Sequence, residues 1–125
     1  MTQALWIPGP LPGVNELIAA AKSGHGRGNA YARIKAAWME AIWIRAKVTR
    51  MKPMVGAVRL SFLWVERDRR RDPDNVAGGG RKLILDGLVK AGVLTDDGID
   101  EIRSWVDTFA VDKTSPGVRV ELGPA

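Results

Sequence analysis

The spacing of apolar residues changes twice between residues 56 and 122, and this change restricts the chain to a fold that mixes helices and strands. Apolar and polar side chains alternate in Gly56–Val65, as expected for a strand with one buried face. Between residues 84 and 89 the apolar residues recur at helical spacing, and Gly92 follows where a helix C-terminus favours glycine. Alternation then returns in Ile102–Val111 and Val118–Leu122, which predicts two further strands.

The sequence before residue 56 predicts three more elements. Prolines between residues 8 and 12 exclude a helix there, and a short edge strand is expected at Ala4–Ile7. Asn15–Ala21 predicts a short helix, and Asn29 is a suitable N-cap for a longer helix that ends near Val48. We therefore expect a single domain of α/β (α+β) class over residues 1–125, with helices packed on a small mixed sheet. The expected order is β-α-α-β-α-β-β.

Three smaller features lead to specific expectations. Residues 24–28 are rich in glycine, which predicts a loop, and we assign no function to the histidine in it, His25. Lys113–Gly117 joins the last two strands and ends in Ser-Pro-Gly, which predicts that these strands form a hairpin. The apolar stripe of the longer helix is expected to include Ile42 and Val48.

The composition is that of an ordinary globular domain. Hydrophobic residues make up 46% and charged residues 26% of the chain, and no apolar run approaches the ~20 residues that a membrane span needs. The first residues lack the basic and apolar regions of a signal peptide. Because the chain contains no cysteine, disulfides and thiolate zinc sites are excluded. We expect a cytoplasmic protein without a membrane partner.

Charge is distributed unevenly along the sequence. The net charge is +5, yet residues 22–52 contain eight Lys or Arg against one Glu, and residues 85–112 contain seven Asp or Glu against two Lys or Arg. A metal-dependent nuclease needs both groups, because cations hold phosphates and carboxylates hold a metal ion. A solvated basic helix beside a solvated acidic turn would give the same distribution.

Asp72 and Asp74 are the strongest candidates for a metal site. Pro73 favours an extended conformation at Asp72, and residues two apart in an extended segment project to the same side. Both carboxylates could then bind one ion, with a third supplied by Asp96 or Asp97 in a following turn. Oxygen ligands of this kind suit Mg²⁺, or Mn²⁺ in its place. The alternative is structural, since Asp and Asn are also typical of turns and helix caps.

Basic residues lie on both sides of these carboxylates in the sequence. Lys82 and Asp86 are four residues apart and would share one face of the predicted helix, where Lys82 could stabilise the phosphate at which a DNA strand is cut. The triplet Arg69, Arg70 and Arg71 could contact neighbouring phosphates. The structural alternatives are an intrahelical ion pair and a solvated arginine run.

The run from Arg69 to Asp97 resembles the central signature of RusA-like Holliday junction resolvases. It reads RRRDPDN and then, after VAGGG, continues as RKLILDGLVKAGVLTDD. In that family an Asp-x-Asp-Asn element, a helix with lysine and then aspartate, and an acidic pair occur in this order. Pro8–Asn15 is similar to the proline-rich N-terminal segment of the family with its asparagine. The resemblance covers most of the chain, and its specific part lies in the run of 29 residues from 69 to 97.

The resemblance implies a dimeric, Mg²⁺-dependent endonuclease of phage type that resolves Holliday junctions in DNA recombination and repair and needs no small-molecule cofactor. Matched by position, its metal-binding and catalytic residues would be Asp72, Asp74 and Asp97 with the catalytic lysine Lys82. Residues near the site would be Asp86 and Asn15, and the expected DNA-binding residues are Arg69, Arg70, Arg71 and Arg81. The glycines before Arg81 make this segment longer than in compact members, which leaves Arg81 as an alternative to Lys82.

Assembly and substrate follow from the same resemblance. A four-way junction is two-fold symmetric, and a homodimer would supply two sites for two matched cuts. One or two of the five tryptophans could anchor the subunit interface, where tryptophan is favoured. Two other functions stay open at this point: a non-catalytic module that binds branched DNA, and a flap or single-strand nuclease that uses the same carboxylates.

Overall fold

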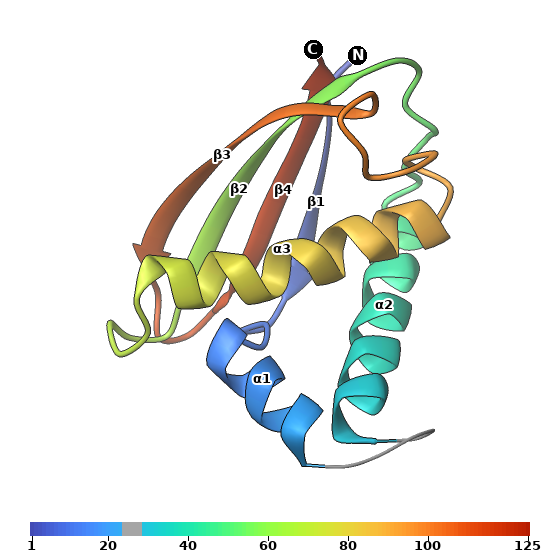
Figure 1. The fold of residues 1–125 in the computed structure, drawn as a ribbon. Helices are drawn as coiled ribbons and strands as arrows, with labels where there is room; N and C mark the ends of the chain where they lie inside the picture. Colours follow the sequence, from blue (N-terminus) through green and yellow to red (C-terminus); the bar gives the residue numbers. More distant parts are fainter. Residues whose placement is uncertain (24–28) are drawn as a thin grey trace.

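The computed structural model describes residues 1–23 and 29–125, and its elements follow the predicted order β-α-α-β-α-β-β (Figure 1). The strands are β1 (Gln3–Pro8), β2 (Val58–Glu66), β3 (Ile102–Val111) and β4 (Gly117–Pro124). The helices are α1 (Val14–Lys22), α2 (Ala30–Val48) and α3 (Pro73–Lys90). The predicted α/β (α+β) class is confirmed, whereas the predicted glycine-rich loop with His25 lies outside the described residues.

The four strands form one mixed sheet in the order β1-β4-β2-β3. Strand β4 is antiparallel to both of its neighbours, β1 and β2, whereas β3 is parallel to β2 and lies at the edge of the sheet. The predicted hairpin is therefore wrong, because β2 lies between β3 and β4. Adjacent strands are about 4.8 Å apart, so the connection has to cross only about 10 Å, which five residues can span.

Burial explains why β4 rather than β3 takes the inner position. Val118, Val120 and Leu122 of β4 are at most 2% exposed, while Ile102 is the one residue of β3 that is buried. An inner strand needs apolar side chains that reach the core, and β4 meets this condition better than β3. The turn residues between the two strands carry no information about this long-range choice, which is why they suggested a hairpin.

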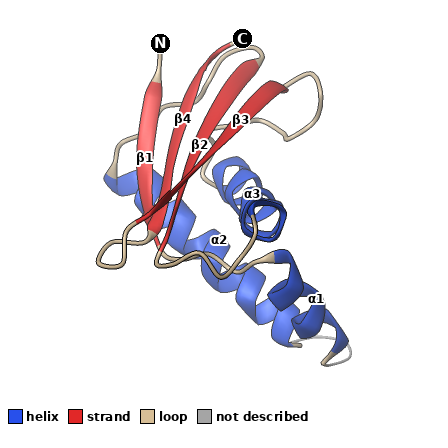
Figure 2. Cartoon of the chain, turned by 90° about the vertical axis from the view of Figure 1, so that its left-hand side faces the viewer, coloured by secondary structure: helices blue, strands red, loops and turns tan. Residues whose placement is uncertain are grey.

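The helices cover one face of the sheet, and the core lies between the two layers (Figure 2). The sheet contributes large, fully buried side chains from three strands, namely Ile7, Leu60, Phe62, Trp64 and Leu122. The helices contribute Ile42, Leu83, Ile84 and Leu88. Within the described residues, no helix combines the length and the apolar character that a bilayer crossing demands.

Helix α2 begins where the sequence predicts and buries less of its surface than expected. The side chain of Asn29 caps the helix by accepting a hydrogen bond from the backbone N–H of Ala32 at 2.8 Å. Among its residues only Ile42 and Ala46 are buried. Val48 is 66% exposed, so its predicted place in the apolar stripe is wrong, because it lies on the solvent side of the last turn, in which only Ala46 is buried.

Helix α3 starts earlier than its apolar pattern indicates, and it contains the run Gly78–Gly80. Glycine costs a helix about 1 kcal/mol relative to alanine, so packing has to explain its presence. A β-carbon on Gly79 would overlap the backbone of Pro12, and one on Gly80 would overlap the indole of Trp64. The glycines therefore allow α3 to approach the N-terminal segment and β2 closely, and this approach positions the first turn of the helix.

Candidate functional site

The first turn of α3 holds two of the candidate metal ligands. Asp72 is the N-cap, with φ −76° and ψ 163°, and its Oδ1 accepts a hydrogen bond from the backbone N–H of Asn75 at 2.8 Å. Pro73 follows at the start of the helix, where proline is favoured. The predicted extended geometry ends at Asp72, because Asp74 already belongs to the helix. The capping interpretation of Asp72 is confirmed.

Asp72 and Asp74 line the same hollow of the surface, which has a volume of about 480 Å³. Its other walls come from the start of α1, including Asn15, and from Asn75 in α3. The backbone N–H of Asn15 donates a hydrogen bond of 3.0 Å to Oδ1 of Asn75 and so ties the two helix starts together. The structure thus brings Asn15, Asp72 and Asp74 to one place.

The carboxylate oxygens in this hollow are largely without protein partners. Within the described residues, Asp74 makes no hydrogen bond or ion pair, and Asp72 uses Oδ1 alone, for its cap. Both residues are exposed. The partial positive charge of a helix N-terminus favours acidic residues here even without a ligand, which is the structural reason for their position. The open oxygens are nevertheless free to bind a cation.

The arginine run before α3 divides into fixed and free side chains. Arg71 forms two hydrogen bonds of 2.8 and 2.9 Å with Glu66 and one of 2.9 Å with Glu16. The bonds to Glu66 are the main reason that the pKa of Arg71 is raised. The Arg71 side chain thus ties the loop between β2 and α3 to the end of β2 and to α1. The side chain of Arg70 is 89% exposed, and its one contact with a charged group among the described residues is a long one of 3.7 Å with Asp68.

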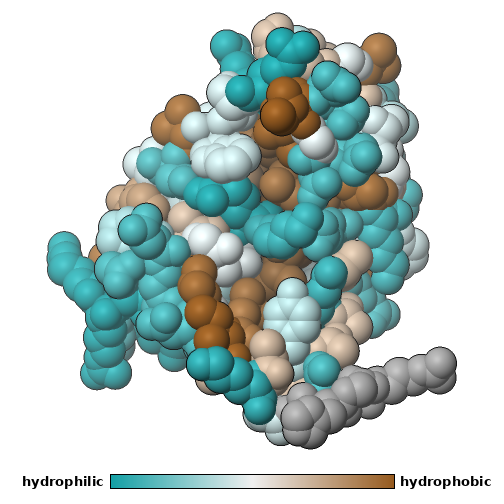
Figure 3. All heavy atoms as spheres, in the orientation of Figure 1, coloured by the Kyte–Doolittle hydropathy of each residue, from teal (hydrophilic) through white to brown (hydrophobic). Residues whose placement is uncertain are grey.

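Arg69 has no hydrogen-bond or ion-pair partner among the described residues, and it is exposed. It lines a second hollow of about 380 Å³ together with Asp72 and Phe109. Asp72 therefore borders both hollows, with carboxylates on one side and an unpaired cation on the other. Figure 3 shows hydrophilic side chains gathered over this end of the molecule.

A separate charge network occupies the middle of α3. Nζ of Lys82 lies 2.6 Å from Oδ2 of Asp97 and 3.1 Å from Oδ1 of Asp86, and Lys35 of α2 lies 3.4 Å from the other oxygen of Asp86. The hydrogen bond with Asp97 is the main reason that the pKa of Lys82 is raised. The same bond lowers the pKa of Asp97. The predicted proximity of Lys82 and Asp86 is confirmed, and Asp97 joins them.

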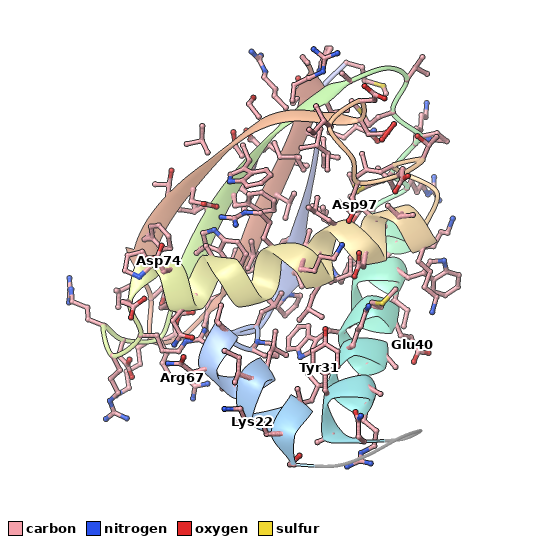
Figure 4. The ribbon with its side chains drawn as sticks, viewed as in Figure 1. Lys22, Tyr31, Glu40, Arg67, Asp74 and Asp97 are labelled. Atoms are coloured by element: carbon pink, nitrogen blue, oxygen red, sulfur yellow. The ribbon has the colours of Figure 1, made fainter. Side chains whose placement is uncertain are left out.

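The structure does not bring Asp97 to Asp72 and Asp74. Asp74 and Asp97 lie towards opposite ends of α3 (Figure 4). Eight helical positions separate Asp74 from Lys82, which corresponds to about 12 Å along the axis, whereas ligands of one Mg²⁺ ion lie about 2.1 Å from it. In the part of the chain that the structure describes, no group of three Asp, Glu, His or Cys side chains could hold a metal ion.

Arg81 points to the sheet, on a different side of α3 from Lys82. It pairs with Asp107 of β3, which also accepts a hydrogen bond of 2.9 Å from Nε1 of Trp64. The guanidinium lies 4.6 Å from the ring centre of Trp105, within range for a cation–π contact. Arg81 is only 18% exposed, so this position links α3 to β3 and offers little to DNA.

Sequence reasoning missed the partners that fix these side chains. Glu16, Glu66, Asp107 and Lys35 were not identified as site residues, and all but Glu66 lie far from their partners in the sequence. Only the spacing of Glu66 five residues before Arg71 could have suggested a local contact. No protein-family model matches the sequence, and a comparison with curated proteins finds no significant match.

Proposed function

We propose that this protein is a Mg²⁺-dependent endonuclease that cuts branched DNA, and specifically a RusA-like Holliday junction resolvase acting as a homodimer. The observation that carries the proposal is the hollow at the start of α3, where Oδ2 of Asp72 and both carboxylate oxygens of Asp74 have no protein partner among the described residues. The resemblance between residues 69 and 97 and the resolvase signature supplies the substrate class.

Two carboxylates are sufficient for such a site. Mg²⁺ keeps several water ligands and is commonly bound by one or two carboxylates together with substrate phosphates, so a site formed by Asp72 and Asp74 alone fits its coordination habits. When bound, the ion would lower the pKa of a coordinated water and neutralise charge that develops on the phosphate. Asn15 and Asn75 offer further polar groups at the rim of the hollow.

The side chains around the hollow have separate tasks in this proposal. Arg69 and Arg70 are exposed and hold the phosphates that flank the cut. Arg71 keeps their loop in place through Glu66 and Glu16. Lys82 is 61% exposed and can reach DNA, whereas Arg81 is held by Asp107, and we therefore assign the catalytic lysine role to Lys82.

The test is incubation of the protein with a synthetic four-way junction and with a linear duplex of the same sequence, with Mg²⁺ and with EDTA. We expect Mg²⁺-dependent, paired cuts in the junction and intact duplex. Binding of the junction without cleavage in either Mg²⁺ or Mn²⁺ would identify a non-catalytic branched-DNA-binding module. Cleavage of flaps or single strands in preference to the junction would identify the other alternative.

A further inference from the structure

The two edges of the sheet differ in how their backbone is covered. At the β1 edge, Nε of Arg45 donates a hydrogen bond of 2.9 Å to the carbonyl of Trp6. The side chain of Gln3 bonds both the N–H and the carbonyl of Lys52, at 2.7 and 2.8 Å. Strand β3 pairs with β2 on one side, and no other described strand pairs with its outer side. Helix and loop residues thus protect β1 but leave β3 open, as its place at the margin of the sheet in Figure 1 indicates.

Strand β3 also exposes large apolar side chains on both of its faces. Trp105 is 47% and Phe109 40% exposed on the face that α3 covers, and Val106 is 60% exposed on the opposite face. Long edge strands with apolar side chains favour pairing with another strand, and stable monomers usually protect them with lysine, proline or a covering segment. Val106–Val111 contains neither lysine nor proline.

We propose that β3 is the surface on which a second copy of this chain binds, by antiparallel pairing of the two β3 strands into one continuous eight-stranded sheet. This inference rests on the homodimer of the proposed function and specifies its interface. Two identical strands can pair across a two-fold axis only if one residue lies opposite its own counterpart, because pairing a residue with its sequence neighbour would place their side chains on opposite faces.

The side chains of β3 select Asp107 as that central residue. An axis at Asp107 places Trp105 opposite Phe109 of the second copy, and this pair occurs twice. Aromatic cross-strand pairs are among the most stabilising in sheets. The two Asp107 side chains would face each other, but each is already neutralised by Arg81 and bonded to Trp64.

The ends of β3 are complementary in charge in this arrangement. Arg103, near the start of the strand, comes alongside Val111 of the second copy, next to Asp112. A parallel arrangement would instead bring each of these charges close to its own counterpart. Opposite charges at the two ends therefore favour antiparallel pairing.

The expected interface is modest in size. Each aromatic side chain can bury about 150–250 Å², so the exposed halves of Trp105 and Phe109 would remove about 400 Å² from water in the dimer. Stable interfaces bury at least about 1,200 Å² in total, and the remainder would come from the strand backbone, Val106 and Val111. We therefore expect association in the micromolar range rather than an obligate dimer.

Disulfide trapping tests the register, and the absence of natural cysteines removes any background. Ser104 and Ala110 are exposed on the face opposite α3 and lie opposite each other in the proposed dimer. A mixture of Ser104→Cys and Ala110→Cys chains should form a cross-linked dimer on mild oxidation, and neither variant should do so alone. The matched control is Ser104→Cys with Thr108→Cys, which is two residues out of register. Equal cross-linking of the control pair, or none in the test pair, would overturn the proposed pairing.

A single substitution in β3 tests the interface independently, through its effect on the oligomeric state. Val106→Lys places a charge in the centre of the interface and should convert the dimer to a monomer in analytical ultracentrifugation at 10–100 μM, roughly the range in which a Kd of micromolar order is resolved. Val55→Lys is the control, because Val55 is 92% exposed outside any strand. A wild-type chain that is monomeric at all concentrations contradicts the interface. Because association is measured without DNA, a dimer without nuclease activity would leave the interface standing and remove the proposed function alone.

Discussion

Aspartate residues at the start of α3 and those around its middle are used in opposite ways. At the start of the helix, Asp74 has no protein partner among the described residues and Asp72 spends one oxygen on its cap. Further along, Asp86 and Asp97 are both engaged by Lys82, and Asp86 also by Lys35. Carboxylates that already have cations gain little from a metal ion, whereas unpaired ones gain most. The start of α3 is therefore the better place for the proposed metal ion, whereas Asp86 and Asp97 are engaged in ion pairs with Lys82.

Asp74→Asn is expected to give the largest effect. The change removes a proposed metal ligand, and we expect the cleavage rate to fall by at least about 100-fold, since metal ions supply several kcal/mol of transition-state stabilisation. Junction affinity should stay the same or increase, because a negative charge near the phosphate is lost. Cleavage under single-turnover conditions and gel-shift titration measure the two quantities.

Asp72→Asn should behave in the same way without unfolding the helix start, because asparagine caps helices as well as aspartate does. The control is Asp100→Asn, an exposed residue outside both groups. Full turnover by either Asp72→Asn or Asp74→Asn at saturating Mg²⁺ would remove the metal site from the start of α3.

Arg81→Ala is expected to affect stability more than function. Breaking the pair with Asp107 leaves a carboxylate that is only 20% exposed without its cation. A fully buried pair would cost 3–5 kcal/mol, and for this partly exposed one we expect about 2 kcal/mol. Urea denaturation should show this loss, with an unchanged cleavage rate under folding conditions. A stable variant with weak DNA binding would instead support the DNA-binding role predicted for Arg81.

Lys82→Ala and Asp97→Asn should each lower cleavage by about 10-fold, less than Asp74→Asn does. If Asp97 acts only by positioning Lys82, the double variant should be no worse than Lys82→Ala, since residues that act as one unit are not additive. A loss in Asp97→Asn as large as in Asp74→Asn would show that Asp97 reaches the metal ion when DNA is bound. Single-turnover rates of the three variants decide between these outcomes.

The smallest expected effect is on the pH dependence of stability that arises from Asp97 and Lys82. The pKa of Asp97 is lowered and that of Lys82 raised, chiefly by their mutual hydrogen bond. The stabilisation by Asp97 is therefore lost as pH falls below about 4, and that by Lys82 as pH rises above about 10. Because Lys82 is 61% exposed, the pair contributes about 0.5 kcal/mol or less. NMR titration should show the pKa of Asp97 return to its usual range in Lys82→Ala.

The helices and strands could be predicted from the sequence, but which of them lie side by side in the fold could not. Periodicity and caps are local properties, and they identified every strand and the cap at Asn29. The hairpin was wrong because the inner position of β4 depends on burial against residues far away in the sequence. The early start of α3 was missed because the fit of Gly79 against Pro12 joins segments that are 67 positions apart.

The candidate site was likewise predictable only in part. Asp72, Asp74 and Asn15 could be grouped from the resemblance, and the structure places them at one hollow. Glu16 and Asp107, which contact Arg71 and Arg81, lie 55 and 26 positions away from them, and no local pattern encodes these two contacts. Asp74 and Asp97 lie far apart because most of α3 separates them. The apolar pattern predicts a shorter helix, since it does not extend to the glycine-rich first turns.

The glycine run in α3 has a consequence for how the protein opens. Three glycines weaken the intrinsic helicity of this segment by about 3 kcal/mol relative to alanine, so the start of α3 persists only while it is docked on residues 12–14. We expect the amides of residues 75–80 and of 13–17 to exchange with solvent in a single local opening, well before global unfolding. A ligand that binds only the closed form would slow exchange in both segments together, even though they belong to different helices.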